Sequence, residues 1–196
     1  MRSTALALAL IFGLAWTATP ASGQSLIKVE DLEAIGTGMG APSGPFTLYS
    51  LKDSRVVVGM DDAERADSAS TAWDIGFRGT TIIINGGTSG PGNGAAALVS
   101  SPFGEVTSVP EASLFLTDGE NECPREDKYA ICTGSGNGWY SYGGSGVIDP
   151  LPDQTIIVRL ADGGYAKMRI IRYQMSNEDG SGPRLYTFEY ELLSGK

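Results

Sequence analysis

The fold of this chain is decided by one stretch, Ser70–Ala96, whose sequence is STAWDIGFRGTTIIINGGTSGPGNGAA. Its first half alternates, so we expect Trp73, Ile75 and Phe77 to point to one face of a strand and the residues between them to the other. The run Thr80–Ile84 consists of β-branched residues and predicts a partner strand. The stretch therefore predicts a hairpin with one apolar face.

A glycine-rich loop follows this hairpin. Asn85 and Gly86 tolerate positive φ and predict a tight turn. The loop Gly86–Gly94 has too few side chains to pack on itself, so we expect it on the surface or against a ligand, with a cleft nearby. Its glycine spacing is not followed by a helix, because Pro102 interrupts the next segment, and a dinucleotide site is not expected.

The rest of the sequence is typical of an antiparallel β protein. Alternating or β-branched segments predict strands at 45–51, 54–59, 95–98, 139–142, 155–160, 165–175 and 185–192, and residues 29–35 fit a short helix or strand. The last three strands are expected to form a meander. In the strand 165–175, alternation places Lys167, Tyr173 and Met175 on one face and Met168 on the core side. We predict a single all-β domain of antiparallel sheets with glycine-rich loops.

Several short motifs occur in an order that resembles a known family. They are the Trp-Asp-Ile-x-Phe-Arg motif at 73–78, Asn-Gly-Gly-Thr-Ser-Gly at 85–90, Trp-Tyr-x-Tyr at 139–142, Asp-Gly-x-Tyr-Ala-Lys at 162–167 and Tyr-Thr-Phe-x-Tyr at 186–190. Over roughly residues 46–192 this order resembles the HmuY-like family of secreted bacterial haem-binding proteins. The resemblance implies an all-β fold, haem or a related porphyrin as the ligand, and an outer-membrane receptor or a host or environmental haem protein as partner.

The N-terminus has the features of a secretory signal. Arg2 supplies the charged start, residues 5–16 the apolar core and residues 21–23 a small-residue cleavage site. We expect a signal peptide at 1–23 and a HmuY-like domain at 24–196. No cysteine comes directly after the apolar core, so a lipid anchor is not expected. The sequence therefore predicts a secreted or periplasmic protein.

The charge balance limits the partners. The formal net charge is −9, and it becomes −10 when Arg2 leaves with the signal. An acidic surface repels nucleic acid and anionic lipid headgroups. We therefore expect no nucleic-acid partner, and a small ligand is more compatible with this surface.

The two cysteines are Cys123 and Cys132, with eight residues between them. In an oxidising compartment this spacing predicts a disulfide that closes a small loop. A zinc or haem ligand role is the alternative, although two thiolates without histidine form a poor metal site.

The sequence contains no histidine, whereas members of the resembled family typically hold haem with a pair of histidines. Thioether and phenolate groups also serve as axial ligands of haem iron. The candidate ligand-binding residues are therefore Tyr140, Tyr142, Met175 and Met60, with Arg78 as a candidate for binding a propionate. For each the alternative is structural: packing for the tyrosines and methionines, and a bond to Asp74 or a loop carbonyl for Arg78.

Catalysis is not expected. Triads that depend on histidine are impossible, and oxidised cysteines supply no thiolate nucleophile. The function predicted by the sequence is capture of haem or a related porphyrin. The alternatives are a family scaffold that has lost haem ligation and binds another ligand or a protein partner, and a structural or adhesion module.

Overall fold

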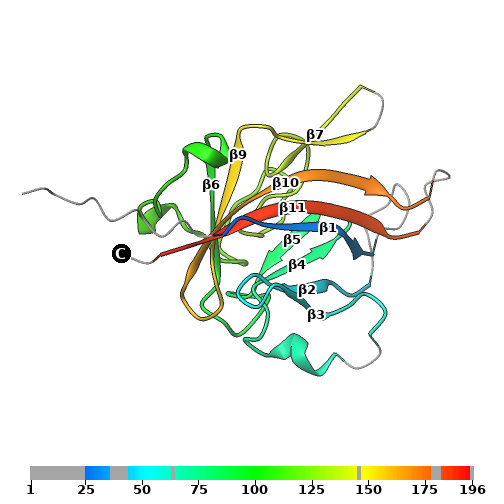
Figure 1. The fold of residues 1–196 in the computed structure, drawn as a ribbon, viewed down its shortest axis with the longest axis horizontal. Coiled ribbons are helices and arrows are strands. Elements are labelled where there is room, and N and C mark those ends of the chain that lie inside the picture. Colours follow the sequence, from blue (N-terminus) through cyan, green and yellow to red (C-terminus); the bar gives the residue numbers. More distant parts are fainter. Residues whose placement is uncertain (1–24, 36–43, 63–64, 145–146, 178–181, 195–196) are drawn as a thin grey trace, which may run out of the picture.

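The computed structural model describes residues 25–35, 44–62, 65–144, 147–177 and 182–194 (Figure 1). Within them the regular structure is β-strand, apart from three short 3-10 helices, η1 (Ala66–Ala69), η2 (Phe103–Glu105) and η3 (Ala112–Leu114). The all-β prediction is confirmed. The predicted signal peptide lies outside the described residues, and no helix among them is long and apolar enough to cross a membrane.

The larger sheet contains the C-terminal meander. Its strands, in spatial order, are β1 (Ile27–Ala34), β11 (Arg184–Leu193), β10 (Tyr165–Met175), β9 (Gln154–Arg159) and β6 (Ala95–Ser100). Every neighbouring pair is antiparallel, and β9, β10 and β11 lie side by side as the sequence predicts. The segment that fitted either a helix or a strand is the edge strand β1.

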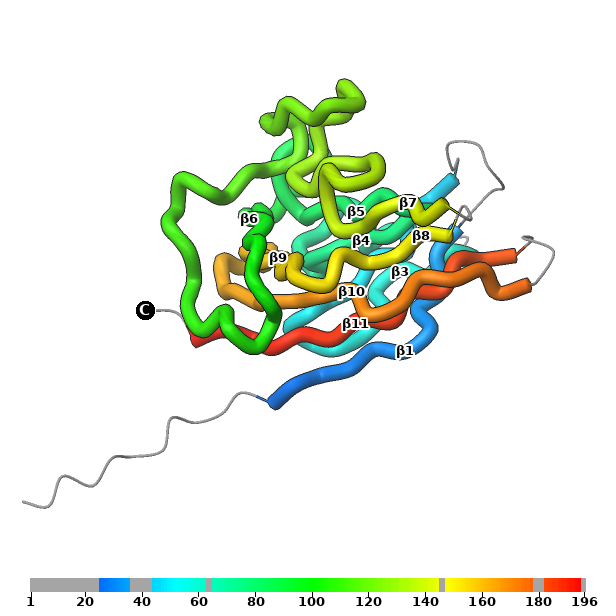
Figure 2. Tube along the Cα trace, turned by 90° about the horizontal axis from the view of Figure 1, so that it is seen from above, coloured from blue at the N-terminus to red at the C-terminus, as the bar shows by residue number. Residues whose placement is uncertain are grey.

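The smaller sheet is built from the opening motif. Its order is β3 (Arg55–Val58), β2 (Thr47–Ser50), β4 (Ile75–Arg78) and β5 (Thr81–Ile84), and a third, two-stranded sheet pairs β7 (Tyr140–Tyr142) with β8 (Ile148–Pro150). The hairpin β4–β5 has the expected register, with Phe77 opposite Ile82. The first two sheets face each other, as in a β-sandwich (Figure 2).

Aromatic side chains fill the space between the two larger sheets. Phe77 of β4 contacts Tyr186 and Phe188 of β11, with ring centroids 4.8 and 5.4 Å apart. Tyr49 of β2 meets Phe188 edge-on at 5.6 Å. These rings are almost fully buried, and aromatic pairs at such separations stabilise a core beyond the area that they bury.

Trp73 does not share the face of Ile75 and Phe77, so that part of the alternation prediction is wrong. Trp73 packs with Leu48 and Ile83 on the opposite face of the smaller sheet, whereas Ile75 and Phe77 belong to the main core. The strand begins only at Ile75, so strand alternation does not extend back to the tryptophan.

Asp74 fixes the chain before that strand. Its carboxylate accepts backbone N–H groups from Leu51 at 2.8 Å and from Ala161 at 2.9 Å, which joins three separate segments. The carboxylate is thus committed to the backbone, and Arg78 is not its partner.

The glycine-rich loop packs against Asn85. The Asn85 side chain is fully buried; its Nδ2 donates to the carbonyls of Ser70 and Trp73, and its Oδ1 accepts the Gly92 N–H. A Cβ on Gly86 would lie 2.0 Å from the Gly94 carbonyl oxygen, so the glycines allow close backbone packing. The positive φ of the turn, +58°, occurs at Gly87 rather than at Asn85 or Gly86 as predicted.

A β-bulge interrupts β10. Its pairing with β11 shifts between Ile170 and Arg172, so the alternation reverses beyond this point. Tyr173 consequently packs against the main core with Met168 instead of sharing a face with Lys167, contrary to the prediction. Met168 is buried in the core as expected.

The predicted disulfide is present. Cys123 and Cys132 are bonded, with their Cα atoms 5.4 Å apart, so neither offers a thiolate. Asp127 lies beside them, but bonded sulfurs are not available as metal ligands.

Candidate ligand-binding site

The candidate site lies at the end of the sandwich where β7, β8 and the far end of β10 meet. Strand β9 accompanies β10 only as far as Met168, and β8 then takes its place beside β10 (Figure 2). Tyr142 at the end of β7 is 56% exposed, and its backbone N–H donates to the hydroxyl of Ser135 at 2.8 Å. Because β8 replaces β9 beside β10, Tyr142 lies at the surface next to the end of β10.

Two residues of β10 complete this surface. Tyr173 is half-buried, and its ring centroid lies 5.5 Å from that of Trp139 and 4.9 Å from that of Tyr186. Met175, two residues further on, is 49% exposed and pairs with Arg184 in the β10–β11 register. A thioether and a phenol, from strands more than 30 residues apart in sequence, thus come to one end of the molecule. We call Tyr142, Tyr173 and Met175 the tyrosine–methionine end.

Electrostatics keep Tyr173 protonated. Burial raises the pKa of the Tyr173 phenol well above its usual value, and the nearby hydroxyls of Tyr142 and Tyr140 add to the rise, while a hydrogen bond and the charge of Arg184 oppose it. At neutral pH Tyr173 is therefore a neutral aromatic surface and not a phenolate donor.

Tyr140 is committed to the fold. It is 3% exposed; its hydroxyl accepts the Gly134 N–H at 3.0 Å and donates to the Thr80 hydroxyl at 3.3 Å. The adjacent Trp139 donates its indole N–H to the Thr80 carbonyl at 3.0 Å. The tyrosine–methionine end thus rests on a buried aromatic layer that is bonded to the β4–β5 turn.

Arg78 lies just before that turn. Its guanidinium stacks 4.1 Å from the centroid of the Phe46 ring, and Nη1 donates to the Gly44 carbonyl at 3.0 Å. Its Nε is buried without a hydrogen-bond partner among the described residues. The loop-carbonyl role considered from the sequence matches these contacts.

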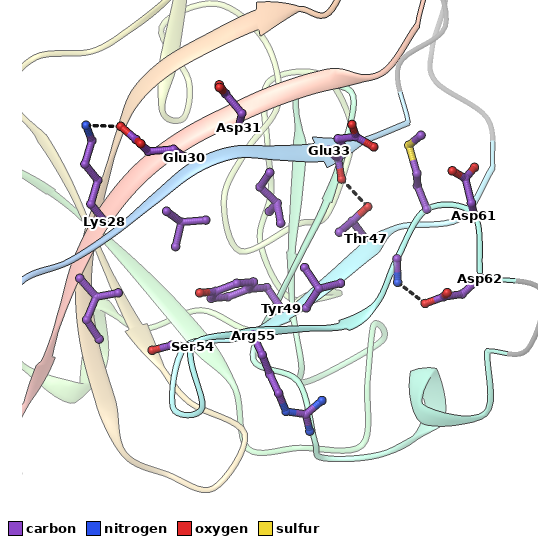
Figure 3. Close-up of a pocket in the computed structure, with 16 residues that line it drawn as sticks. Lys28, Glu30, Asp31, Glu33, Thr47, Tyr49, Ser54, Arg55, Asp61 and Asp62 are labelled. Atoms are coloured by element: carbon purple, nitrogen blue, oxygen red, sulfur yellow. Dashed lines mark hydrogen bonds and ion pairs between the residues drawn. The ribbon is translucent and has the colours of Figure 1, made fainter.

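Met60 lies elsewhere. It lines a groove of about 650 Å³ between β1 and the β2–β3 hairpin (Figure 3). The other lining residues include Val29, Tyr49 and Val56, so Met60 is on a different surface from Met175. We expected a cleft beside the glycine loop. The groove instead lies between β1 and the β2–β3 hairpin, and the glycine loop packs against Asn85.

Among the predicted ligand residues, the structure thus leaves Tyr142 exposed near Tyr173 and Met175 exposed two residues further along the same strand, buries Tyr140, and leaves Met60 in a separate groove. The candidate residues considered from the sequence did not include Trp139 or Arg184. Trp139 and Tyr173 occur in aromatic motifs, but the contact with Arg184 depends on the β10–β11 register after the bulge. No sequence pattern indicates that register.

A family model described as HmuY protein matches residues 45–190. Among solved structures, an HmuY-like heme-binding protein from Bacteroides vulgatus is 16% identical, over 89% of this chain and 94% of that chain, with a TM-score of 0.49. Apo PinO from Porphyromonas gingivitis is 14% identical, over 89% and 100% of the two chains, also at 0.49. An apo HmuY analog from Tannerella forsythia is 12% identical, over 88% and 96%, at 0.43. No curated protein matches the sequence.

Proposed function

Because the chain belongs to the HmuY family, we propose that it is an extracytoplasmic binding protein that captures haem or a related porphyrin at its tyrosine–methionine end. One observation carries this proposal: Tyr142 and Met175, two of the predicted ligand residues, are both about half exposed at the same end of the sandwich. The sequence offers no histidine, so a thioether and a phenol are the donors that this surface supplies.

The residues at this end fit the chemistry of a porphyrin. Thioether sulfur and phenolate oxygen are known axial ligands of haem iron, which would supply the metal centre when bound. The rings of Tyr142 and Tyr173 provide aromatic surface for a flat apolar macrocycle. Arg78 is the proposed partner of a propionate, but its guanidinium stacks on Phe46 and its Nη1 donates to the Gly44 carbonyl, so this pairing requires the side chain to move.

A haemin titration tests this proposal. The mature protein, residues 24–196, is titrated with haemin, and Soret spectra are recorded in both iron states. We expect a saturable band at one equivalent. Met175→Ala should shift this band if the sulfur ligates iron, and Tyr142→Phe, which keeps the ring, should shift it if the phenol does.

Met60→Ala is the matched control because it removes a thioether from the separate groove. It should leave the spectrum unchanged. A spectrum that responds to Met60→Ala and not to Met175→Ala would place the iron in the groove. An unsaturable shift, such as any apolar surface gives, would remove the haem proposal.

The second candidate function is a family scaffold without haem ligation that binds another ligand or a protein partner. The observation that favours it is the lack of histidine. Failure of the haemin titration with a folded protein would leave this candidate.

We propose binding rather than catalysis, since no histidine is available as a base and the two cysteines are bonded to each other. We also propose export with cleavage before Gln24, and delivery of the ligand to an outer-membrane receptor or its removal from a host or environmental haem protein. N-terminal sequencing of the exported protein tests the cleavage site.

A further inference from the structure

The groove that contains Met60 is built from the edges of two sheets. Strand β1 is the last strand of the larger sheet and β3 the last strand of the smaller one, and the groove runs between β1 and the β2–β3 hairpin (Figure 3). Within the described residues, β1 pairs only with β11 and β3 only with β2. Such edge strands can accept a further strand.

The wall of the groove is apolar. Val29 and Leu32 of β1 and Tyr49 of β2 line it, and Leu32 and Tyr49 also belong to the main core. Val56 of β3 lines the same groove and is 43% exposed. A segment that lies in the groove would cover this exposed valine and extend the core outward.

Both ends of the groove are fixed by bonds between the sheets. The Thr47 hydroxyl donates to the Glu33 carbonyl at 2.7 Å, and the hydroxyls of Ser54 and Tyr190 lie 2.7 Å apart. Because these contacts join the two sheets on either side of the open stretch, the groove is preformed. A ligand would not have to separate the sheets.

One end of the groove is strongly acidic. Glu33, Asp61 and Asp62 lie near one another at that end (Figure 3). Asp62 accepts the Gly59 N–H, but the described ion pairs include neither Glu33 nor Asp61.

Among the described ion pairs, none joins Lys28 or Arg55 of the groove to this acidic end, and Arg65 beside it donates to the Gly59 and Phe46 carbonyls. Lys28 pairs with Glu30 at 2.6 Å toward the other end, and Figure 3 shows Arg55 pointing away from the groove. Asp31, held by Arg172 at 2.7 Å, also points away from it. The negative charge at this end therefore favours a ligand that carries a positively charged group there.

We infer that this groove docks an extended basic segment of a partner protein, which adds as a strand beside β1. Side chains of an added strand alternate, so apolar ones would contact Val29 and Val56 while a lysine or arginine reaches Glu33 and Asp61. Complementary charge favours this partner over others. A second copy of the chain is disfavoured, since two copies that each carry a formal net charge of −9 repel each other.

This inference does not depend on haem binding, because the groove is separate from the tyrosine–methionine end. The test uses a fluorescently labelled peptide of alternating lysine and valine, whose binding to the mature protein is followed by anisotropy. We expect saturable binding that weakens with added salt. A glutamate–valine peptide of the same length should not bind.

The matched variants each remove two exposed negative charges. Glu33→Gln with Asp61→Asn should weaken binding of the lysine–valine peptide about tenfold. Glu111→Gln with Asp153→Asn, which lie outside the groove, should leave the affinity unchanged. Far-UV circular dichroism and thermal unfolding are used to check that both variants fold.

Backbone methylation tests the strand mode. A peptide N-methylated at alternate residues along one edge keeps its side chains but cannot donate hydrogen bonds to β1, so we expect it to lose binding. The inference is overturned if the unmethylated peptide shows no saturable binding, if both double variants weaken it equally, or if the methylated peptides bind as well. Concentration-dependent dimers that Val56→Glu abolishes, without peptide binding, would instead assign the groove to a second copy.

Discussion

Replacement of Asn85 should lower the free energy of unfolding by more than is usual for a residue at the start of a loop. In Asn85→Ala, three hydrogen bonds of a fully buried side chain are lost: to the Ser70 carbonyl at 2.9 Å, to the Trp73 carbonyl at 2.7 Å and from the Gly92 N–H at 2.9 Å. Each lost bond of this kind contributes about 1 kcal/mol, and buried groups left unpaired raise the total, so we expect a loss of about 3–4 kcal/mol. Domains of this size have about 5–15 kcal/mol of stability, which makes this a large fraction.

The assay is urea unfolding followed by tryptophan fluorescence, since Trp73 and Trp139 are both buried. With a typical urea dependence of about 2 kcal/mol per molar, the midpoint should fall by about 1.5–2 M. Asn85→Asp should be at least as destabilising, because an oxygen would replace the amide that faces two carbonyls.

Asn93→Ala is the matched control, since Asn93 is exposed and its hydrogen bonds involve only its backbone. Its midpoint should change little. A loss below about 1 kcal/mol for Asn85→Ala, or equal midpoints for Asn85→Ala and Asn93→Ala, would refute the assignment of Asn85 as the residue that organises the loop.

The remaining predictions concern the disulfide, a buried lysine and a buried carboxyl group. Replacing Cys123 and Cys132 by serine should cost about 2–3 kcal/mol, measured by unfolding with and without reductant, and a reductant effect in the double variant would contradict this cause. Lys167→Met leaves Glu191 and two carbonyls of the 103–106 segment without their ammonium partner, so we expect a loss of about 2–4 kcal/mol and faster proteolysis within residues 101–117. Burial raises the pKa of the Asp118 carboxyl above its usual value, although backbone N–H groups oppose the rise. The folded state therefore holds this proton more tightly, and the stability of the wild type relative to Asp118→Asn should fall as pH rises from about 4 through the raised pKa. A difference that grows with pH over this range would contradict the stated direction.

The sequence alone predicted most of the architecture. The β-branched run Thr80–Ile84 and the apolar residues before it form the hairpin β4–β5, and the three C-terminal strands form the expected meander. The cysteine spacing predicted the disulfide. These features depend on residues that are close in sequence, where alternation, turn residues and short loops determine local structure directly.

The candidate site was predicted only in part. Tyr142 and Met175 were named from the sequence, and both reach the surface at one end. Tyr140 was also predicted as a ligand residue, but it is buried, and its hydroxyl is hydrogen-bonded to Gly134 and Thr80. Burial depends on which distant segment covers a side chain, and alternation within a three-residue strand does not reveal that.

The sequence by itself thus determined the class of fold, the local hairpins and the donor types available in a chain without histidine. The tertiary structure decided the face of Trp73, the reversal of β10 at its bulge and the meeting of β1 with the β2–β3 hairpin in an acidic groove. Each of these depends on register and packing between segments far apart in the chain. A shift of one residue in a strand moves its side chains to the other face, and the local sequence pattern does not record such a shift.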